Sequence, residues 1–139
     1  MQTDSILTKK KIPFELKAYN ALMEKGVRDR NAMLRSAFFM ETGSFKPFAD
    51  TTVTGIEQIK PYLIAYNSGG KVTIDFIRCY TYDFEYAGDY ILEYAMCKVA
   101  WSRPDVSGRI EGKGIRIWKR QDDHSLRLYR EIGTHNHLN

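Results

Sequence analysis

The stretch "GKGIRIWKRQDDHSLRLYREIGTHN", residues 112–136, decides the fold because it reads as two β-strands joined at Gln121-Asp122-Asp123. On each strand an aliphatic set alternates with a polar or aromatic set, which is the period of a strand whose two faces differ. The aliphatic set consists of Ile115, Ile117, Leu126, Leu128 and Ile132. The other face is expected to carry Arg116, Trp118, Tyr129 and Glu131. The two faces of this ribbon therefore need different surroundings.

The same period of two extends upstream of the ribbon, where it predicts two more long strands. With the ribbon they form a meander over 71–86, 90–101, 109–119 and 125–134, with a turn at 87–89 and a loop at 102–108. Before residue 71 the pattern is different. It predicts a helix over 13–25 that Gly26 ends, and a weaker helix over 29–35. A short strand over 37–41 and a loop over 42–50 follow, and then a helix from about Gly55 that ends at 67–70. Helices followed by a run of strands indicate an α+β fold, with helices covering one face of a bent sheet.

The length of 139 residues predicts one domain over 1–139, with residues 1–12 flexible. No segment approaches the roughly 18 apolar residues of a membrane-spanning helix. No apolar leader follows the basic run Lys9-Lys10-Lys11, so a cytoplasmic location is expected. The net charge of +4 arises from 21 basic and 17 acidic residues that are interspersed, which argues against a nucleic-acid partner.

The two cysteines, Cys79 and Cys97, are expected to be free and buried; the alternative is a redox pair across a hairpin of the two strands that carry them. Of the three histidines, His124 lies in the predicted turn, and His135 and His137 lie at the carboxyl end. The last two share a strand face but would need a third ligand to hold a metal ion. No metal site is predicted.

Three motifs, in this order, resemble the SnoaL-like and ketosteroid isomerase-like families of the nuclear transport factor 2-like superfamily. They are "VTGIEQI" (53–59), "AGDYILEYA" (87–95) and "GIRIWKRQDDHSLRLYREI" (114–132). The resemblance implies a cone-shaped α+β barrel, with two to three amino-terminal helices on a strongly bent, mixed but mainly antiparallel sheet. It also implies a ligand pocket on the concave side and a homodimer contact on the convex side. Tyr19, Arg116, Trp118, Tyr129 and Glu131 would then line the pocket, and the aliphatic set would form the dimer surface.

The resemblance to ketosteroid isomerases also places Glu41, in "AFFME" (37–41), at the position of the catalytic base. Beside Phe38, Phe39 and Phe45, a buried carboxylate would have a raised pKa through desolvation, as a proton shuttle requires. The alternative is that Glu41 is an exposed residue at the end of a strand. The rest of the chain departs from that pattern, since Tyr19 is one residue out of step and Arg116 replaces the protonated acid. An arginine holds a carboxylate or an oxyanion but does not donate a proton at neutral pH.

The sequence leaves three functions open. In the first, the cone binds a small anionic or aromatic organic molecule and acts on it as a cofactor-independent isomerase, cyclase, hydratase or lyase. In the second, it binds such a ligand without turnover. In the third, the domain is an oligomerisation (association) module. No cofactor is predicted. Polar groups that converge on an apolar interior favour the first two functions jointly, and the sequence does not separate them.

Overall fold

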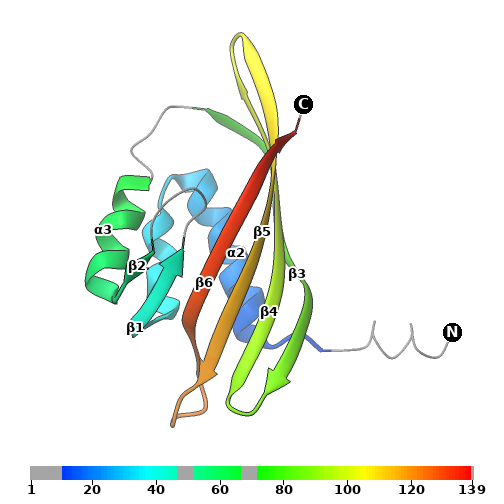
Figure 1. The fold of residues 1–139 in the computed structure, drawn as a ribbon. Helices are drawn as coiled ribbons and strands as arrows, with labels where there is room; N and C mark the ends of the chain where they lie inside the picture. Colours follow the sequence, from blue (N-terminus) through cyan, green and yellow to red (C-terminus); the bar gives the residue numbers. More distant parts are fainter. Residues whose placement is uncertain (1–10, 47–51, 67–71, 139) are drawn as a thin grey trace, which may run out of the picture.

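The computed structural model describes residues 11–46, 52–66 and 72–138 of the chain (Figure 1). Three sequence predictions therefore fall on residues outside these ranges. They are most of the flexible segment 1–12, the part of the loop 42–50 that follows Lys46, and the helix stop at 67–70. The elements are α2 (Phe14–Asp29), the 3-10 helix η1 (Ala32–Phe38), β1 (Phe39–Lys46), β2 (Val53–Thr54), α3 (Ile56–Tyr66), β3 (Thr73–Ala87), β4 (Tyr90–Arg103), β5 (Val106–Arg120) and β6 (Leu126–Leu138).

The six strands form one mixed sheet in the order β2-β1-β6-β5-β4-β3. Strands β3 to β6 are antiparallel neighbours, β1 is antiparallel to β2, and β1 runs parallel to β6. Figure 1 shows the helices on one side of the long curved strands. The face of the sheet toward the helices is called the inner face below, and the opposite one the outer face. The predicted α+β class with a bent, mainly antiparallel sheet is confirmed; β2 and β3 are the sheet's two edges, so it is not closed.

Helix α2 begins directly after Pro13, which is its N-cap residue and has the extended backbone angles φ −55° and ψ 145°. The helix continues past Gly26, where the sequence predicted its end, because Arg30 is the residue that adopts the left-handed conformation, with φ 55°. The backbone N–H of Asn31 then donates to the carbonyl of Gly26 at 2.7 Å and closes the last turn. The predicted helix over 29–35 is instead the 3-10 helix η1, three residues later.

Two predicted loops are in part strands. Strand β1 continues to Lys46, through the first half of the predicted loop 42–50. The loop predicted over 102–108 is reduced to Pro104-Asp105, because β4 and β5 pair as far as Arg103 and Val106. A Cβ atom on Gly108 would lie 2.6 Å from the ring of Trp101, so glycine here accommodates the indole instead of breaking the strand. The resulting hairpin, yellow in Figure 1, projects beyond the helices.

A bulge in β6 changes which residues of the ribbon share a face. Arg116 pairs with Glu131 and Ile117 with Arg130, but Trp118 pairs with Leu128, so Tyr129 is the extra residue. A bulge reverses the alternation of the strand beyond it. Leu126 and Leu128 therefore join Trp118 on the inner face and in the core. Their predicted place on the dimer surface is wrong, as is the predicted inner position of Tyr129, whose ring lies 6.1 Å from that of Tyr90.

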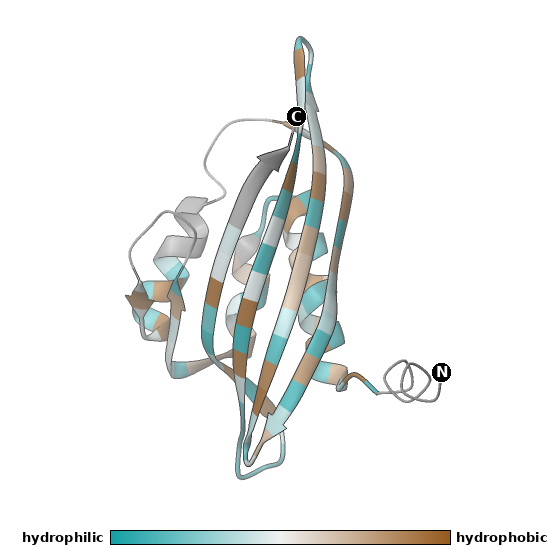
Figure 2. Cartoon of the chain, turned by 45° about the vertical axis from the view of Figure 1, so that its right-hand side comes forward, coloured by the Kyte–Doolittle hydropathy of each residue, from teal (hydrophilic) through white to brown (hydrophobic). Residues whose placement is uncertain are grey.

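The core fills the space between the helices and the inner face. Its buried apolar residues are Leu16, Tyr19, Phe39, Phe45, Ile59, Phe84, Ile91, Trp118, Leu126 and Leu128. Figure 2 shows hydrophobic and hydrophilic residues alternating along the long strands, which is why one sheet has both a core face and an outer face.

Cys79 and Cys97 are joined in a disulfide between β3 and β4. The prediction of free thiols is wrong, because the register of β3 and β4 sets the two cysteines directly opposite one another, with their Cα atoms 4.2 Å apart. In the sequence the hairpin was visible, but the pairing within it was not.

We therefore expect no reactive thiol when the protein is unfolded without reductant, and an intact mass lower by two hydrogen atoms. Because the two cysteines are 18 positions apart in the sequence, reduction should lower the free energy of unfolding by about 3 kcal/mol. Labelling of both cysteines would contradict the disulfide. Since disulfides are rare in the reducing cytoplasm, the same experiment also bears on the predicted cytoplasmic location.

Candidate functional site

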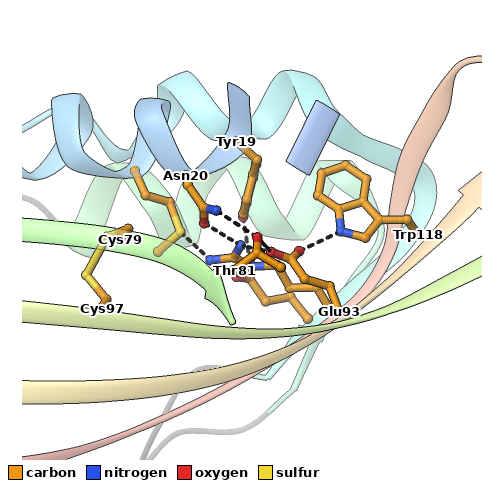
Figure 3. Close-up of polar contacts among 10 residues, drawn as sticks. Tyr19, Asn20, Cys79, Thr81, Glu93, Cys97 and Trp118 are labelled. Carbon is orange, nitrogen blue, oxygen red and sulfur yellow. Dashed lines mark hydrogen bonds and ion pairs between the residues drawn. A yellow bond between two sulfur atoms is a disulfide. The ribbon is translucent and has the colours of Figure 1, made fainter. Parts of the chain in front are cut away.

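Polar and amphipathic side chains meet between helix α2 and the inner face of the sheet, and Figure 3 labels Tyr19, Asn20, Thr81, Glu93 and Trp118 among them. This buried polar cluster consists of Tyr19 and Asn20 from α2, Thr81 from β3, Glu93 from β4, Arg116 and Trp118 from β5, and Glu131 from β6. Its three charged residues are almost inaccessible, with Arg116 3%, Glu93 0% and Glu131 5% exposed. Charges at this depth are tolerated only when they are paired and hydrogen-bonded.

Arg116 is the centre of the cluster. Its Nε donates to Glu131 Oε2 at 3.0 Å, and its Nη1 donates to Glu93 Oε2 at 3.1 Å and to Asn20 Oδ1 at 2.8 Å. Nη2 points to the sulfur of Met23 at 2.8 Å, and the guanidinium carbon lies 4.6 Å from the ring centre of Tyr19. One guanidinium is thus shared by two carboxylates and stacked against an aromatic ring.

Glu93 is held entirely by donors of the sheet. Besides Arg116, its carboxylate accepts hydrogen bonds from Thr81 Oγ1 at 2.5 Å and from Trp118 Nε1 at 2.8 Å. Asn20 Nδ2 in turn donates to Thr81 Oγ1 at 2.9 Å and ties helix α2 to this group. The sequence reasoning missed Glu93, although its alternation with the buried Ile91 and Ala95 on β4 placed a carboxylate on the inner face.

Glu131 is held between the helix and the sheet. Tyr19 Oη donates to its Oε1 at 2.6 Å, while Arg116 Nε donates to its Oε2. Burial by itself raises the pKa of Glu131, but the charges of Arg35 and Arg116, with these hydrogen bonds, outweigh it and hold the pKa below its ordinary value. Burial raises the pKa of Tyr19 well above its ordinary value. At neutral pH the carboxylate is therefore ionised and the phenol keeps its proton.

An aromatic wall adjoins the cluster. The rings of Tyr19, Phe38 and Trp118 contact one another edge to face, with centroid separations of 5.4 to 6.0 Å. Such pairs add to the stability gained from burial alone. The site therefore has a charged end around Arg116 and an apolar end formed by this wall.

Of the six residues predicted for the site, the structure brings four together: Tyr19, Arg116, Trp118 and Glu131. Tyr129 is excluded from the inner face by the bulge in β6. Glu41 is exposed on β1, although Phe39 and Phe45 of the same strand are buried. Of the two settings that the sequence left open for Glu41, the structure has the exposed one, and the pairing of β1 with β6 shifts register between Phe39 and Ser44, across the segment that holds Glu41.

One pocket of the described residues lies outside the cluster. An open pocket of about 480 Å³ is lined by Arg30, Val72, Thr73, Ser102, Arg103 and Pro104. No group of three or more metal-binding side chains occurs in the described part of the chain, which does not include the side chains of His135 and His137. None of the described helices is both long enough and apolar enough to cross a bilayer.

No protein-family model matches the chain, and no curated protein shows significant sequence similarity to it. Solved structures do resemble it. A ketosteroid isomerase-like protein from Erwinia carotovora superposes with a TM-score of 0.69 at 8% identity, covering 86% of this chain and 92% of that one. A protein from Catenulispora acidiphila in complex with S-DNPA gives 0.67 at 14% identity, covering 87% and 90%.

An NTF2-like protein from Cytophaga hutchinsonii gives a TM-score of 0.58 at 16% identity, covering 96% of this chain and 98% of that one. At these identities the likeness concerns the fold, and it agrees with the fold expected from the three sequence motifs. The chain has an α+β fold like that of these ketosteroid isomerase-like and NTF2-like structures.

Proposed function

We propose that the protein binds a small organic acid between helix α2 and the inner face of the sheet, where the buried polar cluster meets the aromatic wall. The observation that carries this proposal is the shared guanidinium of Arg116, which is buried and contacts Glu93 and Glu131. Burying three charges is costly, and apolar residues of similar size would often give equal or greater stability. A buried arginine in a fold that encloses ligands is therefore better explained by an anionic ligand than by stability.

The protonation of the cluster and the exposure of Glu41 favour binding without turnover. An efficient acid or base at neutral pH needs a pKa near 7, whereas the pKa of Glu131 is lowered and that of Tyr19 is raised. Glu41, which was predicted to be the base, is exposed. A cofactor-independent isomerase or lyase reaction would need a further titrating group beside the ligand.

The acid-binding proposal predicts a selective rise of the melting temperature. Small aromatic and aliphatic carboxylic acids should stabilise the wild type, whereas the matched neutral amides should not, because only the acids pair with Arg116. In Arg116→Ala two carboxylates remain without their cation, so the affinity for acids should fall by about 1.5–3 kcal/mol. A thermal-shift screen measures both effects. Equal shifts with acids and amides, or no shift with any acid, would contradict the proposal.

We further propose a homodimer that forms through the outer face of the sheet. Ile115 and Ile132 are cross-strand neighbours there and are 42% and 47% exposed. Tyr94 pairs with Ile115, and its ring lies 6.2 Å from that of Tyr82, so the apolar surface spans β3 to β6. An apolar patch that extends over several strands is typical of an interface.

Replacing Ile132 by Asp should convert this dimer to a monomer, because a carboxylate would be desolvated at the centre of the contact. Sedimentation velocity measures the change. The matched control is Val106→Asp, since Val106 is also 47% exposed but lies at the tip of the β4–β5 hairpin, away from the patch. A monomeric wild type, or an Ile132→Asp variant that remains dimeric, would overturn this proposal. A dimer that binds no acid would favour the oligomerisation module.

A further inference from the structure

The two carboxylates that flank Arg116 are held in different ways. Glu93 accepts from Thr81, Arg116 and Trp118, all of which belong to strands adjacent to its own, and it is fully buried. Glu131 accepts from Arg116 and from Tyr19, which lies on helix α2. The first carboxylate is fixed within the sheet, whereas the second is held across the contact between helix and sheet.

The two donors that hold Glu131 are arranged as a receptor for one carboxylate group. Tyr19 Oη lies 2.6 Å from one oxygen and Arg116 Nε lies 3.0 Å from the other, so each oxygen receives its own donor. The guanidinium of Arg116 lies over the ring of Tyr19 at 4.6 Å, which keeps the two donors side by side. Nothing in this arrangement requires that the carboxylate belong to the same chain.

We propose that Tyr19 Oη and Arg116 Nε form a carboxylate receptor that Glu131 occupies in the free protein, and that a small monocarboxylate binds by replacing Glu131 there. Glu93 stays in place throughout as the positioning residue that keeps Arg116 oriented, through its hydrogen bond to Nη1. This inference rests on the acid-binding site proposed above and adds the atoms, the ligand class and the exchange.

The exchange involves Glu131 because its replacement leaves no donor unpaired. A monocarboxylate offers its two oxygens to the two donors of Glu131, whereas a ligand in place of Glu93 would have to satisfy three donors, from Thr81, Arg116 and Trp118. The displaced carboxylate remains near positive charge, since Arg35 of η1 also acts on Glu131 electrostatically. The receptor adjoins the aromatic wall of Tyr19, Phe38 and Trp118. Acids with a compact apolar or aromatic tail fit this surrounding, and dicarboxylates do not.

Chemical rescue tests the receptor directly. Glu131→Ala removes the internal carboxylate, and sodium acetate should then raise the melting temperature of this variant saturably, at concentrations that barely affect the wild type. Acetamide and sodium chloride at equal concentration should have no such effect. The matched control is Glu93→Ala, which acetate should not rescue because that position is sealed within the sheet. Absence of rescue in Glu131→Ala, or equal rescue in Glu93→Ala, would overturn the inference.

A second variant covers the case in which Glu131→Ala does not fold. Glu131→Gln keeps the shape but weakens the internal competitor, so its affinity for acetate should exceed that of the wild type by about tenfold, which corresponds to one charge-assisted hydrogen bond. An unchanged or lower affinity would contradict the exchange. Rescue of Glu131→Ala without acid binding by the wild type would support the receptor but refute the proposed function. Acid binding by the wild type without rescue of Glu131→Ala would support the proposed function but refute the receptor.

Discussion

Replacing Arg116 by Ala is expected to lower the free energy of unfolding by about 3–5 kcal/mol, the usual cost of removing one partner of a buried ion pair. The reason is that Glu93 and Glu131 would remain in the core as two negative charges without their shared cation. Urea denaturation at pH 7 measures the loss. The control is Lys113→Ala on the same strand, since Lys113 is exposed and its removal should change stability by no more than about 0.5 kcal/mol.

The loss caused by Arg116→Ala should shrink in acid. In the wild type the pKa of Glu131 is below its ordinary value of 4.5, so its contribution to stability is present above that value and is lost as pH falls through the folded-state pKa. In the variant the same carboxyl is buried without Arg116, so protonation relieves the penalty. The two stability curves should therefore converge between pH 7 and pH 4. A loss below about 1 kcal/mol at pH 7, the level of an exposed ion pair, would show that the ion pairs are not buried in solution.

Trp118→Ala should destabilise the protein by a similar amount, about 3–5 kcal/mol. Trp118 is fully buried, contacts the rings of Tyr19 and Phe38, and donates its indole N–H to Glu93. Trp118→Phe keeps most of the packing but leaves the Glu93 oxygen without this donor, so a loss of about 1–3 kcal/mol is expected. Chemical denaturation of the two variants separates packing from hydrogen bonding. Equal losses for Ala and Phe would contradict a packing role for the ring.

The alternation of residue types predicted the β5–β6 ribbon and its two different faces, and the resemblance to a known family placed Arg116, Trp118 and Glu131 on the inner one. Leu126, Leu128 and Tyr129 were misassigned, because the bulge at Tyr129 shifts the pairing of β6 with β5. The sign of this shift in the sequence is Arg130, which interrupts the alternation between Leu128 and Ile132. A register is fixed by contacts across the sheet, and one sequence does not contain them.

The buried polar cluster was predictable only in part, for the same reason. Arg116 and Glu131 lie on neighbouring strands of the ribbon, so their meeting followed from one hairpin. Glu93 meets them only through the pairing of β4 with β5, and Asn20 only through the packing of α2 on the sheet. Glu41 was assigned through the resemblance to ketosteroid isomerases, and the irregular pairing of β1 with β6 removed it from the interior.

The exchange of an acid for Glu131 at Arg116 is tested most directly by an NMR titration of two side-chain N–H groups. Arg116 Nε–H donates to the exchanging Glu131, and Trp118 Nε1–H donates to the fixed Glu93. Titration of the wild type with propionate should shift the Arg116 Nε–H resonance saturably and leave the indole N–H of Trp118 nearly unchanged. Propionamide should shift neither. If the Arg116 resonance does not respond to propionate, or if propionamide shifts it equally, acid binding at this receptor is wrong.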